Sequence, residues 1–390
     1  AGHDARTHGD NVDVVQAPRS SGSTLKPLLY AAMLDAGELL PTMLVKDTPY
    51  NYNNFSPHNY GRTFDGAVPA HEVIERSLNV PSVRMLEQFG AERFLAILSQ
   101  MGFTTIDKDA DHYGLSLILG GAEISLEALA RAYYYLAAEL AGDPVYEQIA
   151  YLSDAHRDRL PARRIPISRA AAWLTFDALS NANRPEEEAS WMDFATGRRI
   201  AWKTGTSWGN RDAWSVGVNR DWVVAIWVGN SDGEGRAGMT GVSYASPVMF
   251  DIFNLLPTEN GQRGTYASNG WFLKPVHGEY FLAEVCPRSG YLKGMDCEDA
   301  DTLMLPRKCI KSEPCPYHQR VEGVRTFILP PSMEWYYRQH NPQYKPYIPK
   351  DKRLYSPMEF IYPENGSVIY IPRQLDGSIA GITFNLAMDP

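Results

Sequence analysis

The sequence has no apolar run long enough to span a lipid bilayer, and its N-terminus lacks the pattern of a secretion signal. It also lacks a surplus of positive charge: 37 Lys and Arg stand against 46 Asp and Glu, a net charge of −9 at pH 7. Nucleic acids and anionic membrane surfaces select basic proteins, so we expect neither as a partner. The 390 residues suffice for two or three domains. We expect a chain that either stays in the cytoplasm or is part of a longer protein.

Cysteine is scarce, and all four cysteines lie in one Pro- and Gly-rich stretch. An even number in such a stretch predicts two disulfides in an oxidising compartment, with Cys286–Cys297 and Cys309–Cys315 as the expected pairs. Four cysteines allow three connectivities. A zinc site with His318 as a further ligand, and free thiols, are the alternatives. Against zinc, the sequence has no C-x-x-C pair, the commonest spacing in structural zinc sites.

The apolar periodicity of the first half of the chain is helical. One stripe begins after Ser23, with Pro27 early enough to be tolerated in the first turn, and it consists of Leu25, Leu28, Leu29 and Met33. Residues 46–70, rich in Asn, Tyr, Pro and Gly, are expected to form a long loop. Further helices are expected over 71–102, from about Ser125 and from an N-cap at Ser168.

The pattern then changes to strands separated by short polar turns, which predicts an antiparallel meander over 199–206, 212–218 and 222–228. The third strand is apolar on both faces, so we expect helices on each side of the sheet and an α+β fold. Beyond about residue 260 the chain is rich in Pro, Gly and Tyr, as in a linker or an irregular segment. Strand character returns near 358–371 and 381–386.

Three short motifs follow one another, and each occurs once. They are Ser23-Thr24-Leu25-Lys26, an S-x-x-K; Ser77-Leu78-Asn79, an S-x-N; and Lys203-Thr204-Gly205-Thr206, a K-T-G-T in a predicted strand. Each motif alone is a weak signal, because its residues could have a purely structural role, such as a helix cap or a solvated lysine. Their shared order and structural settings are together a strong signal.

The spacing of these motifs suits nucleophilic catalysis. A serine hydroxyl is a poor nucleophile until a base takes its proton, and Ser23 and Lys26 lie one helical turn apart. Lys26 can be that base if burial and a nearby cation, Lys203, lower its pKa. Ser77 is expected to relay the proton to the leaving amine, and Asn79 to bind a substrate amide.

The remaining residues of the motifs suit substrate binding. Ser23 near a helix N-terminus places backbone N–H groups beside a developing oxyanion. Gly205 allows an extended peptide to approach the strand edge. The hydroxyls of Thr204 and Thr206 are expected to hold a terminal carboxylate.

Together the motifs resemble the penicillin-recognising serine acyltransferases, and within them the transpeptidase domain of class A (bifunctional) penicillin-binding proteins. Residues 119–125 (LGGAEIS) and 212–214 (DAW) support the resemblance. Residues 286–290 (CPRSG), 315–318 (CPYH) and 362–367 (YPENGS) are similar to the 1C branch of that family.

The resemblance implies a D,D-transpeptidase. Ser23 would attack the D-Ala-D-Ala bond of a peptidoglycan stem peptide, release D-alanine, and pass the acyl group to an amine of a neighbouring stem. β-Lactams would acylate Ser23, the oxyanion hole would be the N–H groups of Ser23 and Thr206, and no metal or cofactor would take part. The resemblance also implies the periplasmic face of the bacterial inner membrane, an anchor outside this chain, and contacts with other cell-wall synthesis proteins.

The resemblance divides the chain into a transpeptidase domain over 1–260, a connecting segment with the four cysteines over 261–350, and a truncated C-terminal β-sandwich over 351–390. Family members begin the catalytic domain with two strands before the nucleophile, and the residues before Ser23 lack that pattern. We therefore expect a fragment in which strand 222–228 has an exposed apolar edge.

Two other functions stay open at this point. A D,D-carboxypeptidase or β-lactamase-like hydrolase would transfer the same acyl group to water. A non-catalytic penicillin-binding sensor or scaffold would keep the pocket without forming an ester.

Overall fold

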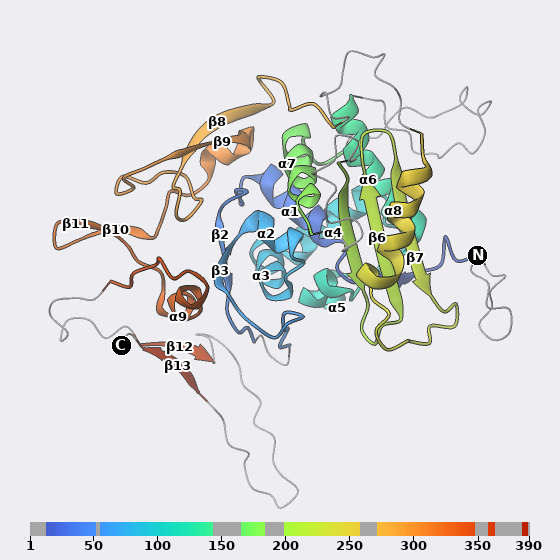
Figure 1. Ribbon diagram of the computed structural model, residues 1–390, viewed down its shortest axis with the longest axis horizontal. Coiled ribbons are helices and arrows are strands. Elements are labelled where there is room, and N and C mark those ends of the chain that lie inside the picture. The colour runs from blue at the N-terminus through green and yellow to red at the C-terminus, as the bar shows by residue number, and fades with distance from the viewer. Residues whose placement is uncertain are drawn as a thin grey trace, which may run out of the picture.

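The computed structural model describes residues 13–51, 55–142, 165–183, 199–257, 271–347, 358–362 and 384–388. Its fold is of the predicted α+β class: helices pack around an antiparallel sheet, and smaller hairpins follow along the chain (Figure 1). No helix within these ranges is long and apolar enough to cross a membrane.

The main sheet is the predicted antiparallel meander, with β6 between its neighbours in sequence. Every residue of β6 is buried, because apolar clusters cover both faces of the sheet. Trp214 belongs to the cluster on one face, whereas Trp202 packs on the other face against α8 (Ser246–Leu255). The strands are β5 (Ala201–Thr206), β6 (Asp212–Val218) and β7 (Val223–Gly229). Within the described residues, β7 pairs only with β6, and most of its residues are half-buried.

Helix α1 (Lys26–Ala36) lies in the centre of the molecule (Figure 1). The predicted apolar stripe is buried, but so is every residue from Lys26 to Leu34. The helix is therefore not amphipathic, because other helices pack around it. Pro27 is in the first turn, as predicted.

The other predicted helices are present. The hydroxyls of Ser125 and Ser168 accept hydrogen bonds from the backbone N–H groups three residues later, so both serines are N-caps as predicted. These caps begin α6 (Leu126–Ala141) and α7 (Arg169–Ser180). The helices expected over 71–102 are α2 (Ala70–Glu75), α3 (Asn79–Phe89) and α4 (Ala91–Gln100). Three shorter elements are β1 (Arg19–Ser20), β4 (Glu123–Ile124) and α5 (Ala110–Tyr113), and β1 pairs with β4.

The long loop predicted over 46–70 is wrong at both ends. Strands β2 (Leu44–Asp47) and β3 (Gly66–Pro69) pair there in antiparallel register. Each has four residues, which is too short for alternation of polar and apolar side chains to be recognised.

The segment beyond residue 260 is more regular than its composition predicts. Its elements are β8 (Tyr280–Val285) paired with β9 (Asp301–Pro306), β10 (His318–Val321) paired with β11 (Val324–Phe327), and α9 (Pro331–His340). We call residues 271–347 the connecting segment and the described residues of 13–257 the main body. Trp271 and Phe272 of the connecting segment are buried in the core of the main body. Packing thus crosses the predicted domain boundary, which stays a prediction.

The last described elements are β12 (Met358–Tyr362) and β13 (Asn385–Met388), which pair in antiparallel fashion. This agrees with the strand character expected near 358–371 and 381–386, of which residues 363–371 and 381–383 lie outside the described residues. The β-sandwich stays a prediction.

Three glycines with positive φ dock the connecting segment on the main body. A Cβ at Gly37 would lie 2.6 Å from the carbonyl oxygen of Lys308. A Cβ at Gly66 would collide with the Met333 carbonyl, and one at Gly290 with the Thr42 carbonyl. Backbone therefore meets backbone at these places, which only glycine permits.

We expect Gly37→Ala to lower the thermal unfolding midpoint more than Gly142→Ala does. Both glycines end a helix in the left-handed conformation, so alanine costs each about 1–2 kcal/mol. Only Gly37 faces the connecting segment; no described atom lies within 4 Å of a Cβ at Gly142. The clash should add about 1–3 kcal/mol. Equal midpoints for the two variants would contradict the docking role of Gly37.

Candidate active site

Ser23 lies in the turn between β1 and α1. From Ser21 to Leu34 it is the one residue that is not buried. The turn is closed by hydrogen bonds from the Thr24 N–H and hydroxyl to the Ser21 carbonyl, at 3.2 and 2.8 Å. The first α-helical residue is Lys26, so Ser23 stands just ahead of the helix. A hydroxyl at this position reaches solvent while its backbone is held rigidly.

The amine of Lys26 is buried beside the S-x-N motif. Lys26 Nζ donates to Asn79 Oδ1 at 2.7 Å and to the Ser77 carbonyl at 2.9 Å. Its side chain is 1% exposed. Burial first, and the charge of Lys203 second, hold the pKa of Lys26 well below its usual range. A neutral amine has two N–H bonds and one lone pair. The neutral form of Lys26 could therefore donate to both observed acceptors and still have its lone pair free to accept a proton.

The second buried amine belongs to Lys203 on β5. Lys203 Nζ donates to Ser77 Oγ at 2.7 Å and to the Thr204 carbonyl at 2.9 Å. Burial lowers the pKa of Lys203 to about 7. Ser77 lies between the two lysines, with its hydroxyl on Lys203 and its carbonyl on Lys26. Its φ of 56° is in the left-handed region, which a serine adopts only where its surroundings impose it.

Strand β5 presses directly on the Ser23 turn. A Cβ at Gly205 would lie 2.8 Å from the Ser21 carbonyl oxygen and 3.3 Å from the Ser23 nitrogen. A Cβ at Gly22 would lie 2.7 Å from the Thr206 nitrogen. The missing side chains therefore let the backbone of the Ser23 turn and the backbone of β5 at Thr206 lie in close contact. We predicted a role for Gly205 in admitting a peptide; the structure shows contact with the turn.

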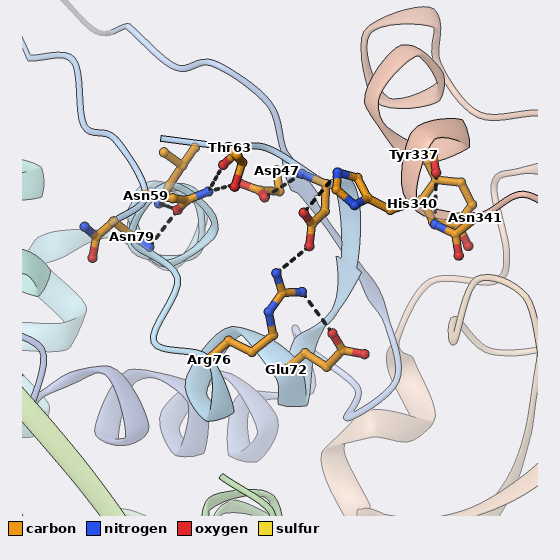
Figure 2. A network of polar contacts seen from close by, with 11 residues as sticks. Asp47, Asn59, Thr63, Glu72, Arg76, Asn79, Tyr337, His340 and Asn341 are labelled. Atoms are coloured by element: carbon orange, nitrogen blue, oxygen red, sulfur yellow. Dashed lines mark hydrogen bonds and ion pairs between the residues drawn. The ribbon is translucent and has the colours of Figure 1, made fainter. Parts of the chain in front are cut away.

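Sequence reasoning missed Asn59. The N-cap residue of α3, Leu78, has no side-chain acceptor, so the first N–H groups of the helix need another partner. Asn59 Oδ1 supplies it, accepting from the N–H of Asn79 at 3.0 Å and of Val80 at 3.1 Å (Figure 2). A helix start without its own cap was the only signal available in the sequence.

Asn59 is held in turn by Asp47, at the end of β2. Asn59 Nδ2 donates to Asp47 Oδ1 at 2.8 Å, and the N–H of Asp65 donates to Asp47 Oδ2 at 2.9 Å. Asp65 pairs with Arg76 at 2.6 Å and lies 3.5 Å from His340 of α9. Figure 2 follows this network from Asn79 to the connecting segment. The S-x-N motif is thus positioned by residues from four separate segments.

The predicted disulfides are wrong, because none of the four cysteines is bonded to another cysteine. Cys309 Sγ donates to the Leu34 carbonyl at 3.3 Å, inside another cluster, away from the sulfur of Cys315. The other three cysteines gather around His318, the residue that the zinc alternative named.

The structure brings all the residues of the three motifs together. A half-buried serine stands at the start of a helix whose buried lysine contacts a second serine, and a second lysine contacts that serine from the facing strand. Two serines and two buried lysines from three distant parts of the chain therefore share one site.

Comparison with known proteins gives the family. The model of the penicillin binding protein transpeptidase domain matches residues 4–254, and the chain therefore belongs to this family. Penicillin-binding protein 1C of Escherichia coli K12 is 36% identical over 246 residues, which are 63% of this chain and 30% of that protein. Penicillin-binding protein 1B of Vibrio cholerae is 28% identical over 254 residues, 60% of this chain and 30% of that protein. The chain spans about a third of the length of these relatives.

Solved structures agree on the fold. Penicillin-binding protein 1A from Haemophilus influenzae superimposes with a TM-score of 0.58 at 18% identity, covering 77% of this chain and 49% of that one. PonA1 from Mycobacterium tuberculosis gives a TM-score of 0.52 at 20% identity, covering 68% and 77%. The predicted resemblance to class A penicillin-binding proteins is confirmed.

We expect Asn59→Ala to slow acylation by a penicillin at least about tenfold. The substitution leaves two N–H groups at the start of α3 without an acceptor, at a cost of about 1–3 kcal/mol each, and loosens the backbone that carries Asn79. A stopped-flow or gel assay with a fluorescent penicillin measures the rate. Thr63→Ala is the matched control, because Thr63 offers Asn59 its backbone carbonyl, which the substitution keeps. Similar rates for both variants would contradict the positioning role of Asn59.

Proposed function

We propose that this chain is a peptidoglycan D,D-transpeptidase that works through an ester on Ser23. The observation that carries the proposal is the Lys26 amine, buried with its pKa held well below the usual range, one helical turn from a serine that is not fully buried. In the first step, Lys26 Nζ takes the Ser23 Oγ proton, and Oγ attacks the carbonyl carbon of the penultimate D-alanine. The N–H groups of Ser23 and Thr206 stabilise the oxyanion.

The tetrahedral intermediate then collapses with cleavage of the C–N bond. The proton held by Lys26 returns to the leaving nitrogen through the Ser77 hydroxyl, and D-alanine departs. Contact between Ser77 Oγ and Lys203 supports this relay, because a hydroxyl that accepts from Lys203 keeps its own proton free to donate. An amine of a second stem peptide then attacks the ester, forms the cross-link, and restores the Ser23 hydroxyl.

The substrate carboxylate is assigned to the end of β5. Thr204 and Thr206 are half-buried, and Gly205 lies between them. Thr206 Oγ1 accepts a hydrogen bond from the Gly241 N–H at 3.0 Å, which leaves its own proton to donate to a carboxylate. The charge of Lys203 attracts the same group. Asn79 would bind the substrate amide with Nδ2, which now contacts the His58 carbonyl at 2.9 Å.

Membership of the family supports a cellular setting for this reaction. Stem peptides would be donor and acceptor, β-lactams would acylate Ser23 as substrate mimics, and the reaction would take place at the periplasmic face of the inner membrane, alongside other cell-wall synthesis proteins. The mechanism uses no cofactor. The chain would contribute its main body as the transpeptidase part of a longer protein.

Intact-mass spectrometry after incubation with a penicillin tests the nucleophile. We expect one adduct per chain, located by digestion to the peptide that contains Ser23 and lost in Ser23→Ala. Ser21→Ala is the matched control, because Ser21 is buried two residues away and its hydroxyl has no hydrogen-bond partner among the described residues. No adduct on the folded wild-type chain, or an adduct that survives in Ser23→Ala, would overturn the proposal.

The fate of the acyl group separates the candidate functions. With a stem-peptide donor and a D-amino acid as acceptor amine, we expect D-alanine release and a product that contains the amine. Release without amine incorporation would make the chain a carboxypeptidase. Binding of the stem peptide with neither an ester on Ser23 nor D-alanine release would favour the sensor.

We expect Lys203→Gln to shift the acidic limb of the acylation pH profile toward higher pH. The reaction needs neutral Lys26, so its rate rises as pH rises through the pKa of Lys26. Lys203 carries its charge below its own pKa of about 7 and lowers the pKa of Lys26. Removing that charge raises the pKa of Lys26. Acylation constants measured across pH test this. Lys203→Arg keeps the charge, so the acidic limb of its pH profile should not shift even if acylation is slower. An unshifted acidic limb in Lys203→Gln would show that the charge of Lys203 does not lower the pKa of Lys26.

A further inference from the structure

Three cysteines of the connecting segment converge on one histidine, and none of these four residues belongs to the catalytic motifs. Cys286 follows β8, Cys297 lies between β8 and β9, and Cys315 precedes His318 at the start of β10. His318 Nδ1 is 3.3 Å from the sulfur of Cys286, and 3.4 Å from the sulfurs of both Cys297 and Cys315. All four atoms lie within 4.8 Å of one another.

We propose that Cys286, Cys297, Cys315 and His318 bind one Zn²⁺ ion in a tetrahedral structural site. With Zn–S bonds of about 2.3 Å and a Zn–N bond of about 2.0–2.1 Å, a tetrahedral angle separates nitrogen from each sulfur by about 3.6 Å. The three observed separations are nearly equal and close to this value. Equal separations are expected of atoms arranged around one centre. A disulfide would instead bring two sulfurs to about 2.05 Å and leave the third cysteine over.

Hydrogen-bond donors surround the sulfurs. The backbone N–H groups of Arg288 and Ser289 lie near the Cys286 sulfur, in a turn that begins Cys-Pro. The backbone N–H groups of Tyr317 and His318 lie near the Cys315 sulfur, in a second turn that begins Cys-Pro. Donors of this kind stabilise a metal-bound thiolate and orient it.

Two further donors complete the surroundings. Ser289 Oγ donates to the Cys315 sulfur at 3.1 Å, and the Gly294 N–H donates to the Cys297 sulfur at 3.3 Å. The sulfurs of Cys297 and Cys315 thus each accept a hydrogen bond from a donor outside the cluster. Such donors favour the thiolate form, which a metal ion requires.

The ligand set selects the ion and its role. Three thiolates and one imidazole favour Zn²⁺ over Mg²⁺ or Ca²⁺, which prefer oxygen ligands. Four protein ligands fill a tetrahedral site and leave no position for water or substrate, so the ion is structural. Binding releases a proton from each cysteine that is still a thiol and uses the lone pair of unprotonated Nδ1, so affinity falls at acidic pH. Cys315 and His318 are three residues apart in the sequence, so they can supply the pair of closely spaced ligands that a C-x-x-C motif supplies in other zinc sites.

The proposed site holds the turn that docks on β2. The carbonyl of Ser289 accepts from the Leu44 N–H at 2.8 Å, and Gly290 packs on Thr42. Strand β2 ends at Asp47, which holds Asn59. The ion would therefore fix one support of the network behind the S-x-N motif, while lying outside it.

Metal and thiol analysis of the whole chain tests the proposal. The chain is purified from medium without added zinc, in the absence of chelator and reductant, and its metal content is measured by plasma mass spectrometry. We expect one zinc per chain and four alkylatable cysteines after unfolding with a chelator. Fewer than four alkylatable cysteines would show a disulfide, and four cysteines without zinc, with no uptake of added Zn²⁺ by the folded chain, would show free thiols; either result would overturn the proposal.

Substitutions then locate the ion. We expect Cys297→Ser and His318→Ala to lose most of the bound zinc and to unfold at lower temperature than the wild type. Cys309→Ser is the matched control, because Cys309 is a buried cysteine of the same segment whose sulfur contacts the Leu34 carbonyl instead. It should keep one zinc. Equal zinc loss in Cys309→Ser and Cys297→Ser would trace the loss to unfolding and overturn the assignment. Should Cys297→Ser fail to fold, Co²⁺ bound to the wild-type chain must show the absorption of a tetrahedral thiolate site, and its absence would overturn the proposal equally.

Discussion

Two lysine amines buried within reach of the same serine are the constraint on which the rest of the structure depends. Like charges in a water-poor site repel, so at least one amine must give up its proton. The protein keeps this costly arrangement by surrounding the amines with acceptors: Asn79 Oδ1 and the Ser77 carbonyl for Lys26, and Ser77 Oγ and the Thr204 carbonyl for Lys203. Three distant segments must meet for those acceptors to be in place, which is why α1 is buried at the centre and β5 lies against its start.

The acceptors need support of their own. Ser77 adopts a left-handed backbone conformation, and α3 begins without a cap from its own sequence. Asn59 provides the missing cap, Asp47 holds Asn59, and the chain of contacts runs on through Asp65 to α9. The geometry of the candidate site is therefore set partly by the connecting segment, a part of the chain that contributes none of the motif residues.

The sequence predicted whatever depends on local pattern. The meander, the serine caps of α6 and α7, and each of the three motifs are encoded by a pattern that spans only a few consecutive residues. Asn59 has no such signal, because the N–H groups that it serves are twenty residues away in the chain. Strands β2 and β3 are too short for their alternation to show. The disulfide prediction was wrong because an even number of cysteines says nothing of the distances between their sulfurs. Three of the sulfurs lie around His318 instead.

The glycines at positions 37, 66 and 290 make the main body and the connecting segment meet through backbone atoms. Contacts between backbone atoms depend little on the side chains nearby. They are lost when the glycine is replaced or when the opposing backbone moves. Natural recombination between related proteins exchanges parts most easily where the joint is a loose tether. A catalytic part transplanted without its own connecting segment would meet foreign backbone at three fixed points, so the two are expected to have been inherited, and to be engineered, as a single unit.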